Sequence, residues 1–453
     1  MMNTRRPRAR LLLPPSSFFL FSMKLHGLRW YIAGLLCLTA GLNYLDRQAL
    51  SILIGTIQKD IPELTDAHYS LITSAFLASY TIMYAVSGWV IDKLGTRKAL
   101  AWFVTGWSCA SLLHAIARTA TQFSIFRFFL GATEAANFPA GIKAVSEWFP
   151  MRERALAVGI FNAGTAIGAC IAAPIIVWMS LSMGWRMAFV VSGGLGLLWL
   201  VLWLLIFRSP RNHPLLTSEE LAIIESGRTA QETAGETDAR KKIPLLNLLK
   251  MKEAWGCIAA RMLTDPISYF LAFWVPKFLQ DEHHFSLKEL GIYSSIPFAA
   301  LALGNIAGGA IPRWLIGALG WNLNRSRKTV MSIATVLVPL SFLLVVRVPN
   351  PALAVALLCV AMFSHAAWAN MTLPAEVFPK HVVGTISGLG GAMGGLMGIL
   401  SQLAIGQLAK RAAATGATPF ATIFTTGAIL YPIAFLLVLL LVRRLGEVRE
   451  IKT

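Results

Sequence analysis

The sequence predicts an all-α polytopic membrane protein whose twelve transmembrane helices form two pseudo-symmetric six-helix halves. The first observation is composition: 56% of the 453 residues are apolar, 14% are charged, and the mean hydropathy is +0.62. A soluble domain has about 25% charged residues. The second is a succession of apolar runs, each long enough to cross a hydrocarbon core of about 30 Å. The third is one long polar interval that divides these runs into two sets of six.

The apolar runs, in chain order, are the predicted transmembrane helices. They are rich in Gly, Ala, Leu and Phe and lack the alternating pattern of a membrane β-barrel. The predicted spans are residues 30–54, 68–91, 99–117, 122–148, 155–178, 186–207, 254–279, 289–318, 328–346, 351–378, 382–409 and 419–443.

The predicted organisation has five parts. They are a basic tail (1–24), a first half (25–207), a cytoplasmic linker (208–252), a second half (253–444) and a cytoplasmic tail (445–453). Met23 and Lys24, followed by LHGLRWY, form a more natural start than Met1, so the preceding residues are interpreted either as a basic tail or as the result of a mis-assigned start.

Orientation follows from the 40 basic residues. Eight fall in predicted outer loops, four fall within spans, and 28 fall on the side of the termini. By the positive-inside rule both termini are cytoplasmic, as in a protein of the bacterial inner membrane. The formal charge of +18 is spread over loops and therefore does not indicate nucleic-acid binding. The five cysteines lie in spans and are expected to be packing residues, and no metal or cofactor site is predicted.

A polar loop, GWVIDKLGTRKAL at residues 88–100, follows the second span. Its glycines allow close helix approach and a tight turn, and its aspartate is expected to pair with Arg97 or to face a helix N-terminus. The alternative is an ordinary charged cytoplasmic turn. A second copy contains Gly308 and Gly309, but Pro312 stands near the place of the aspartate, so this copy is expected to lack the ion pair.

The first loop is similar to the signature loop of the major facilitator superfamily. Within that superfamily the chain resembles the anion:cation symporters, and among them the hexuronate transporters, from Leu25 to about Arg444. The resembling segments are GLRWYIAGLLCLTAGLNYLDRQALS, GIFNAGTAIGA, RMLTDPISYFLAFWVPKFL and VFPKHVVGTISGLGGAMGG. Ala166 and Ala366-Ala367 depart from that branch and leave the substrate open. The loop residues to which the resemblance gives a conformational role are Gly88, Asp92, Gly95, Arg97 and Lys98.

Adjacent charges, Asp46 and Arg47, lie inside the first span. Such side chains cost about 2.5 to 3.5 kcal/mol each on insertion scales, so they indicate a function. The forked guanidinium suits a carboxylate, and we expect Arg47 to bind a substrate anion while Asp46 carries a proton. The alternative is an ion pair that only holds helices together.

The fourth span contains Arg127, Glu134 and Asn137, spaced for one helix face. The resemblance implies that Glu134 is a proton-coupling carboxylate and that Arg127 is a nearby cation. Further polar and aromatic candidates for contacts with a sugar are Tyr80, Asn162, Thr165, Tyr269, Trp274, Trp368 and Asn370. Asp265, before a proline, is expected to belong to a bend or an inner gate. His365 is interpreted either as a titrating group or as a neighbour's hydrogen-bond partner.

The resulting prediction is a proton-driven importer of a hexuronate that works by alternating access, as a monomer and without a cofactor. Its partners are a small anionic substrate, protons and the lipid bilayer. The alternatives are an aldonate, aromatic acid, dicarboxylate or organic phosphate as cargo on the same fold. From another class, the alternative is a non-transporting membrane sensor, which would be expected to carry a large soluble output region. An enzyme is not expected, because the sequence groups no nucleophile and base, and no metal ligands, near one membrane face.

Overall fold

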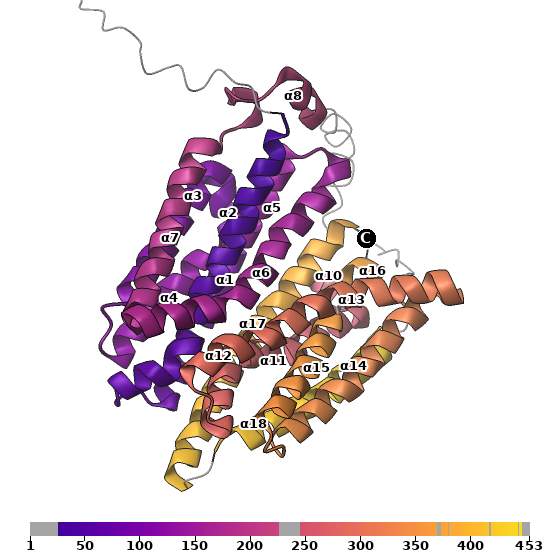
Figure 1. Cartoon of the computed structure of the whole chain (residues 1–453). Helices are drawn as coiled ribbons and strands as arrows, with labels where there is room; N and C mark the ends of the chain where they lie inside the picture. The colour runs from indigo at the N-terminus through magenta and orange to yellow at the C-terminus, as the bar shows by residue number, and fades with distance from the viewer. Residues whose placement is uncertain are drawn as a thin grey trace, which may run out of the picture.

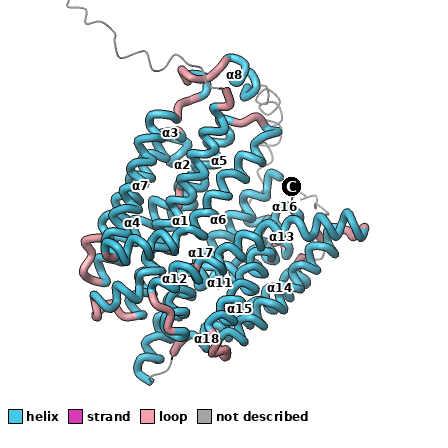
Figure 2. Tube along the Cα trace, in the orientation of Figure 1, coloured by secondary structure: helices cyan, strands magenta, loops and turns pink. Residues whose placement is uncertain are grey.

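In the computed structural model, helices are the only regular structure of the described residues, which are 26–225, 245–368, 373–378, 380–415, 418–442 and 444–445 (Figure 2). Seven helical stretches in this part of the chain are long and apolar enough to cross a membrane. The other predicted spans correspond to helices that carry charged side chains, such as α1 and α11, or that are shorter, such as α15 with its 17 residues.

The first half forms one group of packed helices (Figure 1). Its helices are α1 (Leu28–Asp60), α2 (Asp66–Leu94), α3 (Thr96–His114), α4 (Ala120–Glu134), α5 (Asn137–Trp148), α6 (Met151–Met183) and α7 (Trp185–Ile206). The fourth predicted span was wrong as a single helix, because α4 ends at Glu134 and α5 begins at Asn137. Pro139 explains the break, since proline donates no backbone N–H and its ring crowds the carbonyl four residues earlier.

The second half forms the other group. After η1 (Pro210–Asn212), α8 (Ser218–Glu225) and α10 (Leu245–Leu249) come α11 (Lys252–His283), α12 (Leu287–Tyr293), α13 (Ser295–Leu319), α14 (Leu323–Val345), α15 (Pro351–Ala367), α16 (Leu373–Val377), α17 (Lys380–Thr415) and α18 (Phe420–Leu441). The halves meet where α2 packs on α17, α1 on α11, and α6 on α12 and α13.

The start of α1, the linker and the end of α18 lie at one end of the bundle, here called the linker end. Gly27 at the start of α1 is bonded to Glu220 in α8, and Gly256 near the start of α11 lies against Val442 after α18. The opposite end, here called the loop end, contains the turn between α1 and α2.

Lys277 joins the two halves at the loop end. Its Nζ lies 3.0 Å from Asp66 of α2 and 2.9 Å from Asp281, and it donates to Gln58 of α1 at 3.0 Å. Lys277 is one of the eight basic residues counted in the predicted outer loops, which is wrong, because it lies within α11 and only 5% of it is exposed. A buried ammonium needs such partners to offset its desolvation.

Glycines let α1 and α6 approach closely within the first half. A Cβ added at Gly164 would lie 1.9 Å from the carbonyl oxygen of Cys37, and one at Gly168 would lie 2.6 Å from that of Gly41. Neither contact leaves room for a side chain, so the packing of α1 on α6 depends on these two positions.

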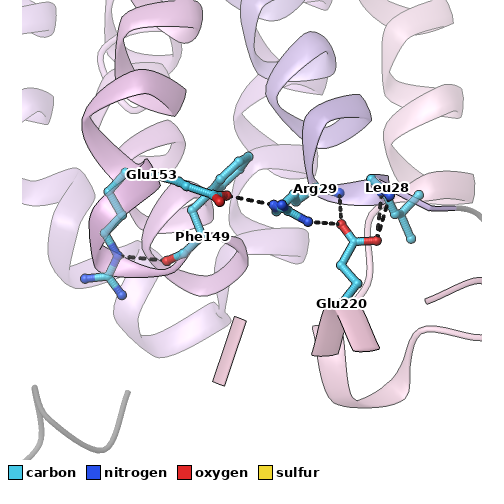
Figure 3. Close-up of polar contacts among 7 residues, drawn as sticks. Leu28, Arg29, Phe149, Glu153 and Glu220 are labelled. Carbon is cyan, nitrogen blue, oxygen red and sulfur yellow. Dashed lines mark hydrogen bonds and ion pairs between the residues drawn. The ribbon is translucent and has the colours of Figure 1, made fainter. Parts of the chain in front are cut away.

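The linker docks on the first half through Glu220 of α8 (Figure 3). Its carboxylate accepts the backbone N–H groups of Gly27 at 2.9 Å, Leu28 at 3.1 Å and Arg29 at 3.2 Å, and a bond from Arg29 Nη1 at 2.8 Å. Arg29 Nε also donates to Glu153 of α6 at 2.8 Å. Since α1 has no side-chain cap of its own, Glu220 satisfies its first donors and places a negative charge at its positive end.

His213 fixes the linker closer to α7. Its Nε2 donates to the Ile206 carbonyl at 2.8 Å, and its Nδ1 accepts the Leu215 N–H at 3.2 Å. Both bonds fit one neutral tautomer, and burial lowers the pKa of His213, which keeps the ring neutral at pH 7.

Gly164→Ala should lower the thermal stability of the purified protein, because the new methyl group forces α1 and α6 apart. We expect a cost of about 1 to 3 kcal/mol. Gly159→Ala on the same helix is the control, since a Cβ there meets nothing within 4 Å. Equal melting temperatures for the two variants would contradict the packing argument.

Glu220→Ala should speed hydrogen exchange at the amides of residues 27–29, because it removes their shared acceptor. The expected loss of local stability is about 1 kcal/mol, in the range of helix caps. Glu219→Ala is the control, because Glu219 is exposed on the same helix. Exchange that is unchanged in both variants would show that the linker does not cap α1.

Candidate functional site

Arg47 of α1 is bound to Glu134 of α4. Its Nε and Nη2 each donate to Glu134 Oε2 at 3.0 Å, and Nη2 donates to Asn43 Oδ1 at 3.3 Å. The Glu134 side chain is fully buried, whereas that of Arg47 is 15% exposed. The structure therefore brings together the predicted anion-binding residue and one of the two predicted proton carriers.

Three aromatic rings surround the Arg47 guanidinium. Its Cζ lies 5.0 Å from the ring centre of Tyr44, 5.4 Å from that of Phe76 and 4.9 Å from that of Tyr80. Rings at such distances stabilise a cation through their quadrupoles. Sequence reasoning predicted Tyr80 but missed Tyr44 and Phe76, although Tyr44 lies only three residues before the arginine.

Asp46 points away from Arg47 into a group of serines. Ser111 of α3 donates to Asp46 Oδ1 at 2.7 Å and lies 3.0 Å from Ser192 of α7. The residue is 1% exposed. Consecutive residues of a helix lie about 100° apart, which explains why the two charges face different sides of α1. The two serines gave no signal in the sequence.

Arg127 of α4 also contacts the region around Arg47. Its Nη2 donates to the backbone carbonyl of Arg47 at 2.8 Å, and its guanidinium lies 5.5 Å from the Phe76 ring. Asn137 lies beyond the break between α4 and α5, and its Oδ1 accepts a bond from Thr39 at 3.5 Å. Arg127 and Glu134 therefore share one helix with Asn137 outside it, which corrects the prediction of a common helix face.

Several buried polar atoms of this cluster have no hydrogen-bond partner among the described residues. They are Asn43 Nδ2, Asp46 Oδ2, Arg127 Nη1 and Glu134 Oε1. Such atoms are rare in protein interiors, because each costs about 1 to 3 kcal/mol. Similar atoms occur elsewhere among the described residues, but here they accompany four buried or largely buried charged side chains, which marks this region as a site for polar chemistry.

The other predicted contact residues are spread over both halves. Tyr80 and Tyr269 are half-buried, Thr165 is half-buried and Asn162 is exposed. Trp274 is fully buried, and its Nε1 donates to Gln402 of α17 at 2.7 Å. Trp368 is also buried, and Asn370 lies outside the described residues.

The signature loop pairs differently from the prediction. Asp92 binds Lys143 Nζ of α5 at 2.6 Å, while Arg97 donates to the carbonyl of Leu204, and Lys98 is exposed. Gly95 has a φ of 74°, which explains the glycine at this turn. A Cβ at Gly88 meets nothing within 4 Å, so the predicted close approach does not occur there.

The second half has an ion pair at the corresponding place, which sequence reasoning missed. Arg327 Nη2 lies 2.6 Å from Glu376 Oε1, and Nη1 donates to the Gly308 carbonyl at 2.5 Å. Glu376 thus supplies a carboxylate although Pro312 replaces the aspartate. The expectation that this copy lacks an ion pair was wrong.

Two polar groups lie in the second half. Arg261 and Asp265 form an ion pair within α11, at 2.9 Å between Nη2 and Oδ2. His365 of α15 lies 2.5 Å from Ser268 Oγ and is hydrogen-bonded to Tyr431 of α18. His365 thus joins three helices, which agrees with its interpretation as a partner of neighbours. In the described part of the chain no three His, Cys, Asp or Glu residues are grouped as metal ligands.

Comparisons with known proteins agree on one family. The family profile described as Major Facilitator Superfamily matches residues 36–402. The hexuronate transporter of Escherichia coli (strain K12) is 36% identical over 388 residues, which cover 85% of this chain and 89% of that protein. The galacturonate transporter of Dickeya chrysanthemi is 36% identical over 314 residues, which cover 69% and 90%.

A solved structure shows the same fold. It is that of a bacterial homolog to the human lysosomal transporter Spinster, in an inward-facing and unoccupied conformation. It superposes with a TM-score of 0.71 at 19% identity and covers 92% of this chain and 98% of that chain.

Glu134→Ala should destabilise the protein by about 3 kcal/mol, because it leaves the Arg47 guanidinium without its carboxylate in a largely buried site. The double variant Arg47→Ala/Glu134→Ala should lose less than the sum of the two single variants. Unfolding of the four purified proteins in detergent measures this coupling. Strictly additive losses would show that the pair does not contribute to stability.

Proposed function

The chain belongs to the major facilitator superfamily, and we propose that it imports a hexuronate together with protons across the bacterial inner membrane by alternating access. The observation that carries the proposal is the Arg47–Glu134 pair, an anion-binding group held by a carboxyl group that protons can neutralise. The identity to transporters named for hexuronate and galacturonate supports the substrate class.

The charges of the first half explain how protons and anion are coupled. With Asp46 and Glu134 ionised, their charges cancel those of Arg47 and Arg127. Protonation of Glu134 weakens its hold on Arg47, so the guanidinium becomes available to a substrate carboxylate. Deprotonation lets Glu134 compete for Arg47 again and favours release.

Alternating access requires contacts between the halves that break and re-form. Lys277 with Asp66 and Gln58 is such a contact at the loop end. We place this end on the periplasmic side and the linker end in the cytoplasm, following the distribution of basic residues. The protein works as a monomer in this proposal, since each half supplies one wall of the pathway.

Uptake by purified protein in liposomes tests the function. Under an inward proton gradient, labelled glucuronate or galacturonate should accumulate, whereas aldonates and organic phosphates should compete poorly. Absence of hexuronate uptake, with uptake of another anion in the panel, would refute the proposed substrate.

Glu134→Gln should abolish accumulation driven by a pH gradient while leaving part of the exchange of internal for external hexuronate. The amide keeps the size of the side chain but cannot take up or release the proton. The matched comparison is between gradient-driven uptake and counterflow in the same liposomes. Wild-type accumulation by this variant would remove Glu134 from the coupling role.

A further inference from the structure

One face of α11, which packs on α17, carries three polar side chains. Arg261, Asp265 and Tyr269 are spaced four residues apart and so lie one above another. Arg261 donates to Asp265 Oδ2 from Nε at 3.0 Å and lies 2.9 Å from it at Nη2, and its Nη1 donates to the Ser387 carbonyl at 3.2 Å. The side chains of the pair are 16% and 13% exposed.

The glycines of α17 make room for this pair. A Cβ at Gly390 would lie 3.1 Å from Arg261 Cδ, and one at Gly391 would lie 3.0 Å from Arg261 Nη1. A Cβ at Gly394 would lie 2.3 Å from Asp265 Oδ2. Gly390, Gly391 and Gly394 therefore determine the position of both charges.

The same face reaches the first half. A Cβ at Gly398 would lie 2.5 Å from the Tyr269 ring and 3.5 Å from Leu77 of α2, so Tyr269 borders the contact between α17 and α2. A Cβ at Gly395, next to Gly394, would lie 2.4 Å from Thr81 Oγ1 of α2. Tyr84 stacks on Tyr80 at 6.0 Å, and Tyr80 packs under the Arg47 guanidinium. Thr81 and its neighbour Tyr80 therefore connect Arg47 of the first half to the glycines that hold Asp265 in the second half.

Under the proposed function, the state of Arg261 would decide what the second half offers to a substrate bound at Arg47. A six-carbon sugar acid whose carboxylate binds Arg47 would direct its other end towards the opposite half. That end carries hydroxyl groups in a hexuronate and a second carboxylate in an aldarate. An unpaired guanidinium there would bind the second carboxylate. A guanidinium already held by Asp265 offers a neutral pair, whose carboxylate accepts hydroxyl donors and repels anions.

We infer that Asp265, by holding Arg261 in the glycine-lined site of α17, restricts the transporter to sugar acids with a single carboxylate. This inference rests on the proposed function and assigns Asp265 a positioning role in substrate choice. It differs from the inner gate expected from the sequence, because the partner of Asp265 lies one turn away on the same helix.

Competition in liposomes tests the inference on the full chain. Uptake of labelled galacturonate is measured with unlabelled galacturonate or galactarate as competitor, and the ratio of the half-inhibitory concentrations gives the selectivity. Asp265→Asn should reduce the preference for galacturonate by about tenfold, which corresponds to about 1.4 kcal/mol. The double variant Arg261→Gln/Asp265→Asn should return towards wild type, because it removes the released cation.

Gly394→Ala gives a second route to the same change, since its methyl group displaces Asp265 and leaves both charges in the protein. Gly388→Ala is its control, because a Cβ there meets nothing within 4 Å. Unchanged selectivity in Asp265→Asn and Gly394→Ala, with galacturonate uptake intact, would overturn the inference. Loss of galacturonate uptake in both would also overturn it, because the pair would then serve uptake itself. A wild-type protein that takes up no hexuronate would instead refute the proposed function.

Discussion

The first half is organised by the need to bury two guanidinium groups and two carboxyl groups in one helix bundle. Arg47 and Asp46 come from α1, Arg127 and Glu134 come from α4, and all four lie between packed helices. An uncompensated buried charge would cost several kcal/mol, so each group depends on the others and on the serines and tyrosines around them. The close approach of α1 to α6 at Gly164 holds α1 in this arrangement.

The second half also buries charged and polar groups, but it stabilises them in a different way. Its central ion pair, Arg261 with Asp265, is closed within one helix and lies against glycines. Its other polar group is held by hydrogen bonds, because His365 joins Ser268 and Tyr431. The two walls of the proposed pathway therefore differ in chemistry. Under the proposed function, the first half carries carboxyl groups that can take up protons, whereas the second half presents a fixed pattern of hydrogen-bonding groups.

Apart from the break in the fourth span, the sequence was sufficient to predict the long helices and the charged residues within them, because hydropathy and burial penalties act locally on each span. It was not sufficient to predict which side chains these charged residues contact. Glu376 replaces a missing aspartate from a distant segment, Ser111 and Ser192 contact Asp46 from other helices, and Lys277 is buried although it was counted with the outer loops. Pro139 indicates the break before α5, but the apolar residues around it made the fourth span look like one continuous helix.

Under the proposed function, the position of Glu134 allows proton binding and anion binding to be coupled by direct contact. The carboxyl group that takes the proton and the guanidinium that binds the anion are in direct contact, so each ligand changes the affinity for the other without a route through the fold. A proton site that does not contact Arg47 could act on the anion only through a conformational change. Asp46 is such a site, because it lies among serines of α3 and α7 and points away from Arg47. Asp46 is therefore placed to sense the packing of α1 on these helices, whereas Glu134 acts on the anion site itself.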